Sequence, residues 1–262
     1  MENLPDSGYT CETVLYKKIN RIELFMDVYQ PDNKKTDASM VLFFGGGWNN
    51  GDRKALSHFA RVFSAKGMTV FCPDYRIRSL HKSTPFDSIK DACSAMRFVK
   101  SNAERFGINP QNAGAGGGSA GGHVALCTFF VPLDENGENS TVTPEPAFFT
   151  LFNPALDTTA LNSPASYALF EGRNAEASPF HHLKPGAPPE IIFHGSDDKL
   201  VPLDCIERFR DKSTEMGNYC ELVVYPGQGH GFFHYAKNPR IFFDIAGNME
   251  KFLISKNFLN SE

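Results

Sequence analysis

The chain has 262 residues, 41% of them hydrophobic and 21% charged, a composition that can bury a large core and that excludes global disorder. Its formal net charge is -4 with both signs interspersed, so it offers no basic stripe to a phosphate backbone. We therefore expect no nucleic acid partner, and a small neutral substrate fits better.

The first part of the chain is predicted to consist of strands joined by short connections. Alternating or continuous apolar residues predict strands at 13–18, 21–30, 40–44 and 68–73. Between the last two strands lie a glycine-rich loop, GGGWNNGD at 45–52, and a helix-like stretch at 54–66 that Gly67 ends. This succession of strand, loop, helix and strand indicates parallel pairing.

The rest of the chain continues the alternation of helices and strands. From Pro85 to about Ala103 apolar residues recur every three or four positions, which predicts an amphipathic helix. Further strands are expected at 112–117, 146–152, 190–195 and 220–225. Further helices are expected directly after Ser119, at 204–217 and at 239–256. The strand at 112–117 has few β-branched residues, so its prediction rests on context.

These elements predict an α/β fold in one domain that spans residues 1–262. Alternating strands and helices are most simply arranged with helices on both faces of the strands. We therefore expect a mostly parallel central sheet flanked by helices. Residues 153–189 are rich in proline and lack periodicity. We expect them to form a loop-rich excursion over the functional site, which amounts to only a small cap.

Ser119 lies in the strongest motif, GGSAG at 117–121, which matches G-x-S-x-G between a predicted strand and a predicted helix. Such a turn exposes a serine hydroxyl as a nucleophile, and the helix N-terminus directs backbone N–H groups at a developing oxyanion. A glycine-rich turn with a serine helix cap is the alternative. In its strand and helix context, the motif resembles the nucleophile turn of α/β-hydrolases.

The segment FFGGGW at 43–48 follows another predicted strand. Consecutive glycines let backbone N–H groups turn toward a carbonyl oxygen without obstruction by Cβ atoms. The segment resembles the H-G-G-G oxyanion loop of esterases, with Phe44 at the histidine position. We expect Gly46 and Gly47, with the backbone N–H of Ala120, to form an oxyanion hole. The choice of loop donors is open by one position, and a flexible loop is the alternative.

An acidic residue and a histidine follow two later strands. The segment HGSDDKLVP at 194–202 offers two adjacent aspartates, Asp197 and Asp198. The frequent α/β-hydrolase pattern H-G-x-x-D-x-x-V-P selects Asp198 by register and leaves Asp197 as a solvated loop residue. His230 lies between glycines in GQGHGFF, where its imidazole can turn toward a nucleophile. The order Ser119, Asp198, His230 is that of α/β-hydrolases, unlike the orders in chymotrypsin and subtilisin.

Further segments extend the resemblance to the carboxylesterase and acetyl xylan esterase-like branch of the α/β-hydrolases, near the hormone-sensitive-lipase-like esterases. The resemblance runs from about Tyr16 to Phe233. Its segments are FFGGGW, PDYR, GGGSAGGH, LFNPALDTT, SPFHHLKPGAPP, IIFHG and GQGHGFF. It implies hydrolysis of short acyl esters by a Ser-His-Asp triad without a metal or organic cofactor. A small-molecule or carbohydrate ester is the implied substrate, including acetyl groups on plant polysaccharides such as xylan.

Other functions stay open at this point. A small serine peptidase or amidase would use the same fold, and loss of a triad member would leave a non-catalytic hydrolase-like binding protein. Trp48 and Phe170 are candidates for lining a substrate pocket, although a core position fits each of them equally well. We expect the pocket to be small, because no long apolar insertion is available to house a fatty chain.

The remaining histidines are assigned supporting positions. We expect His194 to support the loop that carries the aspartates and His123 to pack just behind the nucleophile. The others lack a strand-and-loop context and are expected at the surface or beside the site: His58, His81, His181, His182 and His234.

The cysteines and the apolar segments indicate which cofactors and which cellular compartment to expect. The 6 cysteines are scattered, without the CxxC or histidine spacing of a zinc site, so we expect no metal. No apolar run reaches the roughly 18 residues that span a bilayer, and the first residues lack the features of an export signal. We expect a soluble protein with no membrane partner, either cytoplasmic or secreted after removal of a signal peptide.

Overall fold

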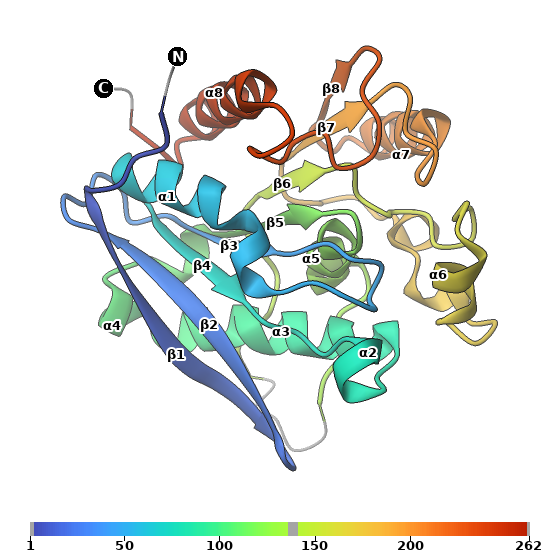
Figure 1. Ribbon diagram of the computed structural model, residues 1–262, viewed down its shortest axis with the longest axis horizontal. Helices are drawn as coiled ribbons and strands as arrows, with labels where there is room; N and C mark the ends of the chain where they lie inside the picture. Colours follow the sequence, from blue (N-terminus) through green and yellow to red (C-terminus); the bar gives the residue numbers. More distant parts are fainter. Residues whose placement is uncertain (1–2, 136–140, 261–262) are drawn as a thin grey trace.

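Eight strands form one mixed sheet in the computed structural model, which describes residues 3–135 and 141–260 (Figure 1). The strands are β1 (Tyr9–Ile19), β2 (Ile22–Pro31), β3 (Ser39–Phe43), β4 (Thr69–Pro73), β5 (Ala113–Gly118), β6 (Phe149–Phe152), β7 (Glu190–Gly195) and β8 (Cys220–Tyr225). Their order is β1-β2-β4-β3-β5-β6-β7-β8. β2 pairs antiparallel with β1 and β4, and the other neighbouring pairs among the described strands are parallel. The predicted mostly parallel sheet is confirmed.

Helices cover both faces of this sheet. The helices α1 (Ser57–Ala65) and α8 (Pro239–Ser255) pack on one face. The other face carries α3 (Pro85–Ser101), α5 (Ala120–Phe130) and α7 (Leu203–Glu215). The buried apolar residues form two clusters, one on each face, because the sheet lies between them. The layers of helix, sheet and helix confirm the α/β fold that the sequence predicts.

Strand β3 shows why a continuous apolar run suits the centre of such a sheet. Met40 and Leu42 belong to the cluster that contains α1 and α8, whereas Val41 and Phe43 belong to the cluster that contains α3 and α5. Successive side chains of a strand point to opposite faces. A strand covered on both sides therefore needs apolar residues at every position.

Strand β5 lacks β-branched residues because its neighbours approach too closely for side chains. A Cβ atom at Gly114 would lie 2.3 Å from the ring of Phe148. A Cβ atom at Gly116 would lie 2.3 Å from Oγ1 of Thr150. The strand is held by its position between β3 and β6, and β propensity plays little part. This explains why the sequence signal for this strand was weak.

Two predicted helices differ from the structure at their ends. The stretch 54–66 divides into a 3-10 helix at Arg53–Leu56 and the helix α1. The helix that begins at Pro85 ends at Ser101 instead of Ala103, and a separate short helix, α4 (Ala103–Phe106), follows it. Short helices that the sequence pattern did not indicate also occur, α2 (Arg78–His81) and a 3-10 helix at Pro110–Asn112. Single turns are too short to show a hydrophobic period.

Residues 153–189, where a loop-rich excursion is expected, form loops with single helical turns. They contain α6 (Pro164–Ala168) and 3-10 helices at Asn174–Ala177 and Pro179–His182. Prolines begin two of these turns, since proline is tolerated at a first helical position. That residues 1–262 form one domain stays a prediction. Among the described residues, no helix has both the length and the apolar character that crossing a membrane would require.

Candidate active site

Ser119 lies on the turn between β5 and α5. Its backbone has φ 54 and ψ -119, a strained conformation for a residue with a side chain. Its glycine neighbours permit a close approach, because a Cβ at Gly117 would lie 2.4 Å from the carbonyl oxygen of Phe43 and one at Gly121 2.1 Å from it. The backbone N–H of Ser119 donates to the carbonyl oxygen of Phe152 at 2.9 Å. The neighbouring strands thus hold the serine at the carboxyl end of β5.

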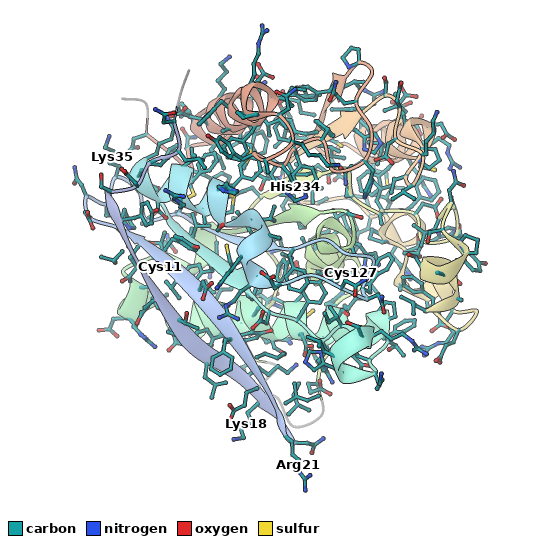
Figure 2. All side chains as sticks on the ribbon, viewed as in Figure 1. Cys11, Lys18, Arg21, Lys35, Cys127 and His234 are labelled. Atoms are coloured by element: carbon teal, nitrogen blue, oxygen red, sulfur yellow. The ribbon has the colours of Figure 1, made fainter. Side chains whose placement is uncertain are left out.

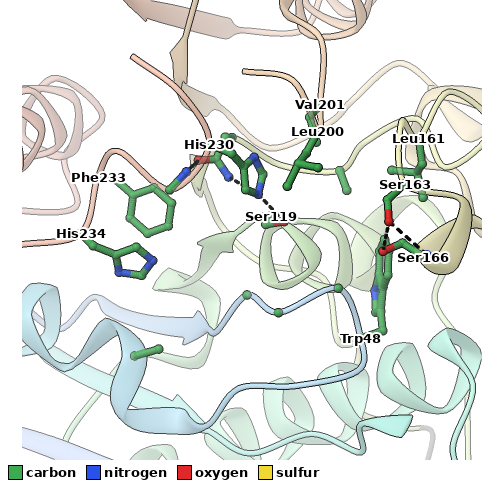
Figure 3. Close-up of a pocket in the computed structure, with 17 residues that line it drawn as sticks. Trp48, Ser119, Leu161, Ser163, Ser166, Leu200, Val201, His230, Phe233 and His234 are labelled. Atoms are coloured by element: carbon green, nitrogen blue, oxygen red, sulfur yellow. Dashed lines mark hydrogen bonds between the residues drawn. The ribbon is translucent and has the colours of Figure 1, made fainter. Parts of the chain in front are cut away.

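The side chains of Ser119, His230 and Asp198 form a continuous chain of contacts, of which Figure 3 shows the one between Ser119 and His230. Nε2 of His230 lies 2.9 Å from Oγ of Ser119. Nδ1 of His230 lies 2.6 Å from Oδ2 of Asp198. Asp198 lies in the loop that follows β7, and His230 lies in the loop that follows β8. The parallel sheet brings these loops to one edge because the carboxyl ends of its strands lie together.

Asp198 is buried with its carboxylate fully engaged. Oδ1 accepts hydrogen bonds from the backbone N–H groups of Leu200 at 2.9 Å and Val201 at 3.0 Å. Burial alone would raise the pKa of Asp198, but the hydrogen bonds from His230 and from these N–H groups hold it below its ordinary value. Asp198 is therefore ionised at neutral pH, whereas its neighbour Asp197 is exposed.

His194 supports this loop from inside the protein. The side chain is fully buried, and its Nε2–H group donates to the carbonyl oxygen of Val201 at 3.0 Å. Burial is the main cause that holds the pKa of His194 below its ordinary value, so the ring is neutral. Nε2 also lies 3.8 Å from Oδ2 of Asp198. These contacts agree with the supporting position that the sequence indicated.

Asn153 is a pocket residue that the sequence reasoning missed, and His234 is one that it placed only loosely. Asn153, directly after β6, is fully buried, and its Oδ1 accepts a hydrogen bond from the backbone N–H of Gly231 at 3.0 Å. Its amide nitrogen lies 3.4 Å from Nε2 of His230. His234, expected at the surface or beside the site, lines the pocket. A polar residue directly after a buried strand of a parallel sheet was the signal for Asn153.

The loop at 45–48 faces Ser119 across the pocket. Gly46 has φ 131 and Gly47 has φ 60, values that glycine adopts without strain. Among the described turn and loop hydrogen bonds, none uses the backbone N–H of Gly46, Gly47 or Ala120 as its donor. These groups are thus available to a bound oxyanion, and their assignment as donors stays a prediction.

Phe44 and Tyr75 brace this loop from below. Phe44 occupies the position at which the resemblance leads us to expect a histidine, and it is buried. Its ring stacks on Tyr75 with centroids 4.1 Å apart and an interplanar angle of 13°. The hydroxyl of Tyr75 donates to the carbonyl oxygen of Phe44 at 2.7 Å. An aromatic stack and a buried hydrogen bond thus replace a polar side chain in holding the loop.

A pocket of about 390 Å³ surrounds Ser119. Residues of the excursion form part of its wall, among them Leu161, Ser163 and Ser166, as Figure 3 shows. Trp48 lines the pocket, whereas Phe170 lies behind it, with its ring centroid 5.0 Å from that of Trp48. The excursion therefore covers one side of the site.

The cysteines lie away from any metal-binding arrangement. Within the described part of the chain, no three His, Cys, Asp or Glu side chains lie close enough to hold a metal ion. Figure 2 shows Cys127 on α5 inside the protein and Cys11 on β1. Cys72, Cys93 and Cys127 are buried.

Comparison with solved structures shows a close match over the whole chain. The structure superposes on Thermogutta terrifontis esterase 2 phosphonylated by sarin with a TM-score of 0.92 and 32% sequence identity. The match covers 100% of this chain and 99% of that one. A butyrate-bound structure of the same esterase gives a TM-score of 0.88 and 33% identity and covers 96% of each chain.

Comparison of sequences points to the same class of protein. The BD-FAE family model matches residues 26–144. A probable isoprenylcysteine alpha-carbonyl methylesterase of Arabidopsis thaliana is 28% identical over 86% of this chain and 51% of that protein. An acetylxylan esterase of Xylanibacter ruminicola is 27% identical over 64% of this chain and 35% of that protein. The chain thus spans about half or less of the length of these two relatives.

Proposed function

The chain belongs to the carboxylesterases of the α/β-hydrolase fold, and from this premise we propose that it hydrolyses esters of short carboxylic acids. Ser119 is the nucleophile, His230 the general base and Asp198 the group that orients the histidine. The proposal rests on two contacts, 2.9 Å from Ser119 Oγ to His230 Nε2 and 2.6 Å from His230 Nδ1 to Asp198 Oδ2. Transfer of the serine proton requires this arrangement.

In the first half of the reaction, Oγ of Ser119 attacks the ester carbonyl carbon while its proton passes to Nε2 of His230. Negative charge develops on the carbonyl oxygen. The backbone N–H groups of Gly46, Gly47 and Ala120 stabilise this charge, and one well-placed donor lowers the barrier by about 3 kcal/mol. The ionised carboxylate of Asp198 stabilises the imidazolium that forms.

The tetrahedral species then breaks its bond to the alcohol oxygen, which leaves with the proton from His230 Nε2. The acyl group remains on Ser119 as an ester. A water molecule gives a proton to the same histidine and attacks the acyl carbon. Collapse of this second tetrahedral species releases the carboxylic acid and returns the proton to Ser119.

The pocket supports a short acyl group as the substrate of this reaction. Its volume of about 390 Å³ around Ser119 leaves room for a short acyl chain. The Thermogutta esterase has been solved with butyrate, a short carboxylate. The relationship to an acetylxylan esterase supports acetyl groups on xylan as one natural substrate of this size.

The experiment that tests the proposal is hydrolysis of p-nitrophenyl esters from acetyl to decanoyl, with acetylated xylan assayed in parallel. The wild-type protein and Ser119→Ala are compared on each substrate. We expect hydrolysis of the short esters, with kcat lower in the variant by roughly 10⁴-fold or more. Equal inactivity of both proteins on every ester would refute the esterase proposal, and an amidase or a binding protein would replace it.

The acyl series also tests the size of the substrate. Faster hydrolysis of decanoyl than of acetyl esters would contradict the short acyl pocket while leaving Ser119 as the nucleophile. Release of acetate from acetylated xylan supports the polysaccharide substrate. Hydrolysis of p-nitrophenyl acetate without release of acetate from xylan removes xylan as a substrate and keeps the esterase activity.

A further inference from the structure

Trp48 lines the pocket although only 2% of its surface is exposed. It follows the three glycines of the oxyanion loop directly, and its backbone has φ 56, an unusual value for a tryptophan. The carbonyl oxygen of Trp48 accepts a hydrogen bond from the backbone N–H of Arg78 at 2.9 Å. The indole is therefore attached at a defined place to the loop that faces the nucleophile.

The indole N–H group of Trp48 points away from the pocket, to His123. Nε1 of Trp48 donates to Nδ1 of His123 at 3.1 Å, and His123 is fully buried outside the pocket lining. The rings of His123 and Phe170 each meet the indole edge to face, with centroids 5.0 Å away. Because the indole N–H is already used, Trp48 presents only an apolar surface to a substrate.

His123 is neutral and holds one tautomer. Burial lowers the pKa of His123 to about 4. Nε2 lies 2.7 Å from the carbonyl oxygen of Ala177, which only accepts, so Nε2 carries the hydrogen and Nδ1 accepts from Trp48. The backbone N–H of His123 donates to the carbonyl oxygen of Ser119 at 3.0 Å. His123, a residue of the nucleophile helix α5, therefore joins that helix to the oxyanion loop and to the excursion through its side chain.

The chemistry of the leaving group indicates which part of the ester faces Trp48. The alcohol oxygen must receive its proton from Nε2 of His230, so the alcohol lies on the side of that histidine. Phe233 and His234 follow His230 in the chain and line that side (Figure 3). The acyl chain extends to the other side of Ser119, where Trp48 lies.

We propose that Trp48 is the wall that ends the acyl pocket and that His123 is a positioning residue that holds it, so that this pair sets the longest acyl chain the protein accepts. The inference rests on the proposed ester hydrolysis at Ser119. It adds a specificity-determining residue and a residue that acts through it.

The first test compares Trp48→Ala with Trp48→Phe in two series of esters. The acyl series is p-nitrophenyl acetate to decanoate, and the alcohol series is methyl to octyl acetate. We expect Trp48→Ala to raise the ratio of kcat/KM for octanoate to that for butyrate by roughly tenfold or more, since each accommodated methylene is worth about that factor. Trp48→Phe keeps most of the wall and is expected to shift the ratio less.

The second test separates positioning from simple stability. His123→Leu removes both polar contacts, whereas His123→Gln keeps an acceptor and a donor at similar positions. We expect His123→Leu to shift the acyl ratio in the same direction as Trp48→Ala and His123→Gln to restore the wild-type ratio. In the double variant of Trp48→Ala and His123→Leu, the two shifts are expected to be less than additive, since both act through the indole.

A ratio of two kcat/KM values measured on one preparation does not depend on the fraction of folded protein, so partial misfolding does not imitate the effect. The proposal is overturned if both Trp48→Ala and His123→Leu keep the wild-type acyl ratio, or if only the alcohol series changes. These outcomes differ from failure of the proposed function, in which Ser119→Ala and the wild type would behave alike on every ester, whether active or inactive.

Discussion

The carboxylate of Asp198 contacts His230 at 2.6 Å between Oδ2 and Nδ1, although the two residues lie 32 positions apart in the chain. Its neighbour Asp197 is exposed, and its carboxylate accepts a hydrogen bond from the hydroxyl of Ser196 at 2.8 Å. The backbone N–H groups of Leu200 and Val201 hold Oδ1 of Asp198 and leave Oδ2 for the imidazole. Substitution of Asp197 is therefore a matched control for substitution of Asp198.

The first prediction uses this pair. Asp198→Asn should lower kcat by about 10⁴-fold on p-nitrophenyl acetate, because an amide cannot hold the required tautomer of His230 or stabilise its charged form. Asp197→Asn should change kcat by less than about twofold. Both constants are measured at the same pH. Comparable losses in the two variants would remove Asp198 from the mechanism.

The second prediction concerns Asn153, whose side-chain oxygen accepts a hydrogen bond from the backbone N–H of Gly231 inside the protein. Asn153→Ala leaves that N–H group without its acceptor, so we expect the free energy of unfolding to fall by about 1 to 3 kcal/mol. We also expect kcat to fall by roughly tenfold, because the loop that carries His230 loses its anchor. Urea unfolding and steady-state kinetics measure the two effects.

Asn162→Ala is the control for this prediction. Asn162 is exposed, and its side chain makes a single hydrogen bond, to the carbonyl oxygen of Lys199 at 3.3 Å. We expect its free energy of unfolding to stay within about 0.5 kcal/mol of the wild type. If Asn153→Ala behaved in the same way, Asn153 would have no part in holding the histidine loop.

The third prediction tests the oxyanion loop with two glycines that both have positive φ. A Cβ at Gly46 would lie 2.1 Å from the carbonyl oxygen of Asn50, whereas a Cβ at Gly172 would meet no atom within 4 Å. Gly46→Ala should lower kcat/KM by about 10²-fold or more, because the loop must move and its backbone N–H donors leave their positions facing Ser119. Gly172→Ala keeps the site and should stay within about twofold. Equal activity of the two variants would show that this loop does not hold the oxyanion.

The fourth prediction concerns the stability of the protein as a function of pH. Glu190, at the start of β7, is fully buried, and burial raises its pKa to about 8. The carboxyl group accepts a hydrogen bond from the hydroxyl of Ser213 at 3.1 Å. In the unfolded chain its pKa is about 4.3. Between these two values the folded protein keeps a proton that the unfolded chain has lost.

The free energy of unfolding therefore contains a contribution from Glu190 that is fully present below the unfolded pKa and is lost as pH rises through the folded value. Its slope is at most about 1.4 kcal/mol per pH unit. Glu190→Gln should remove this slope, so its stability relative to the wild type rises from pH 5 to pH 8. Urea unfolding at both values checks this, with Glu207→Gln on the exposed side of α7 as the control. Parallel pH profiles for the wild type and Glu190→Gln would contradict the assignment.

Several features of this protein could be read from local sequence. The apolar run of β3 and the glycine-flanked Ser119 each describe their own surroundings, because strand burial and turn geometry depend on residues close in the chain. The order of Ser119, Asp198 and His230 along separate strands also pointed to one edge of a parallel sheet. Element ends were less well determined, as the early end of α3 at Ser101 shows.

Other features were decided only by tertiary structure. Asn153 and Gly231 meet because β6 ends beside the loop after β8, and no short segment contains both residues. The contact between Trp48 and His123 spans 75 positions in the same way. Local sequence selects strands, helices and turns, whereas strand order and register determine which distant side chains share a pocket. The sequence by itself therefore indicated the kind of chemistry at the site. The fold decided which residues line the pocket, which residues hold the loops around it and how large it is.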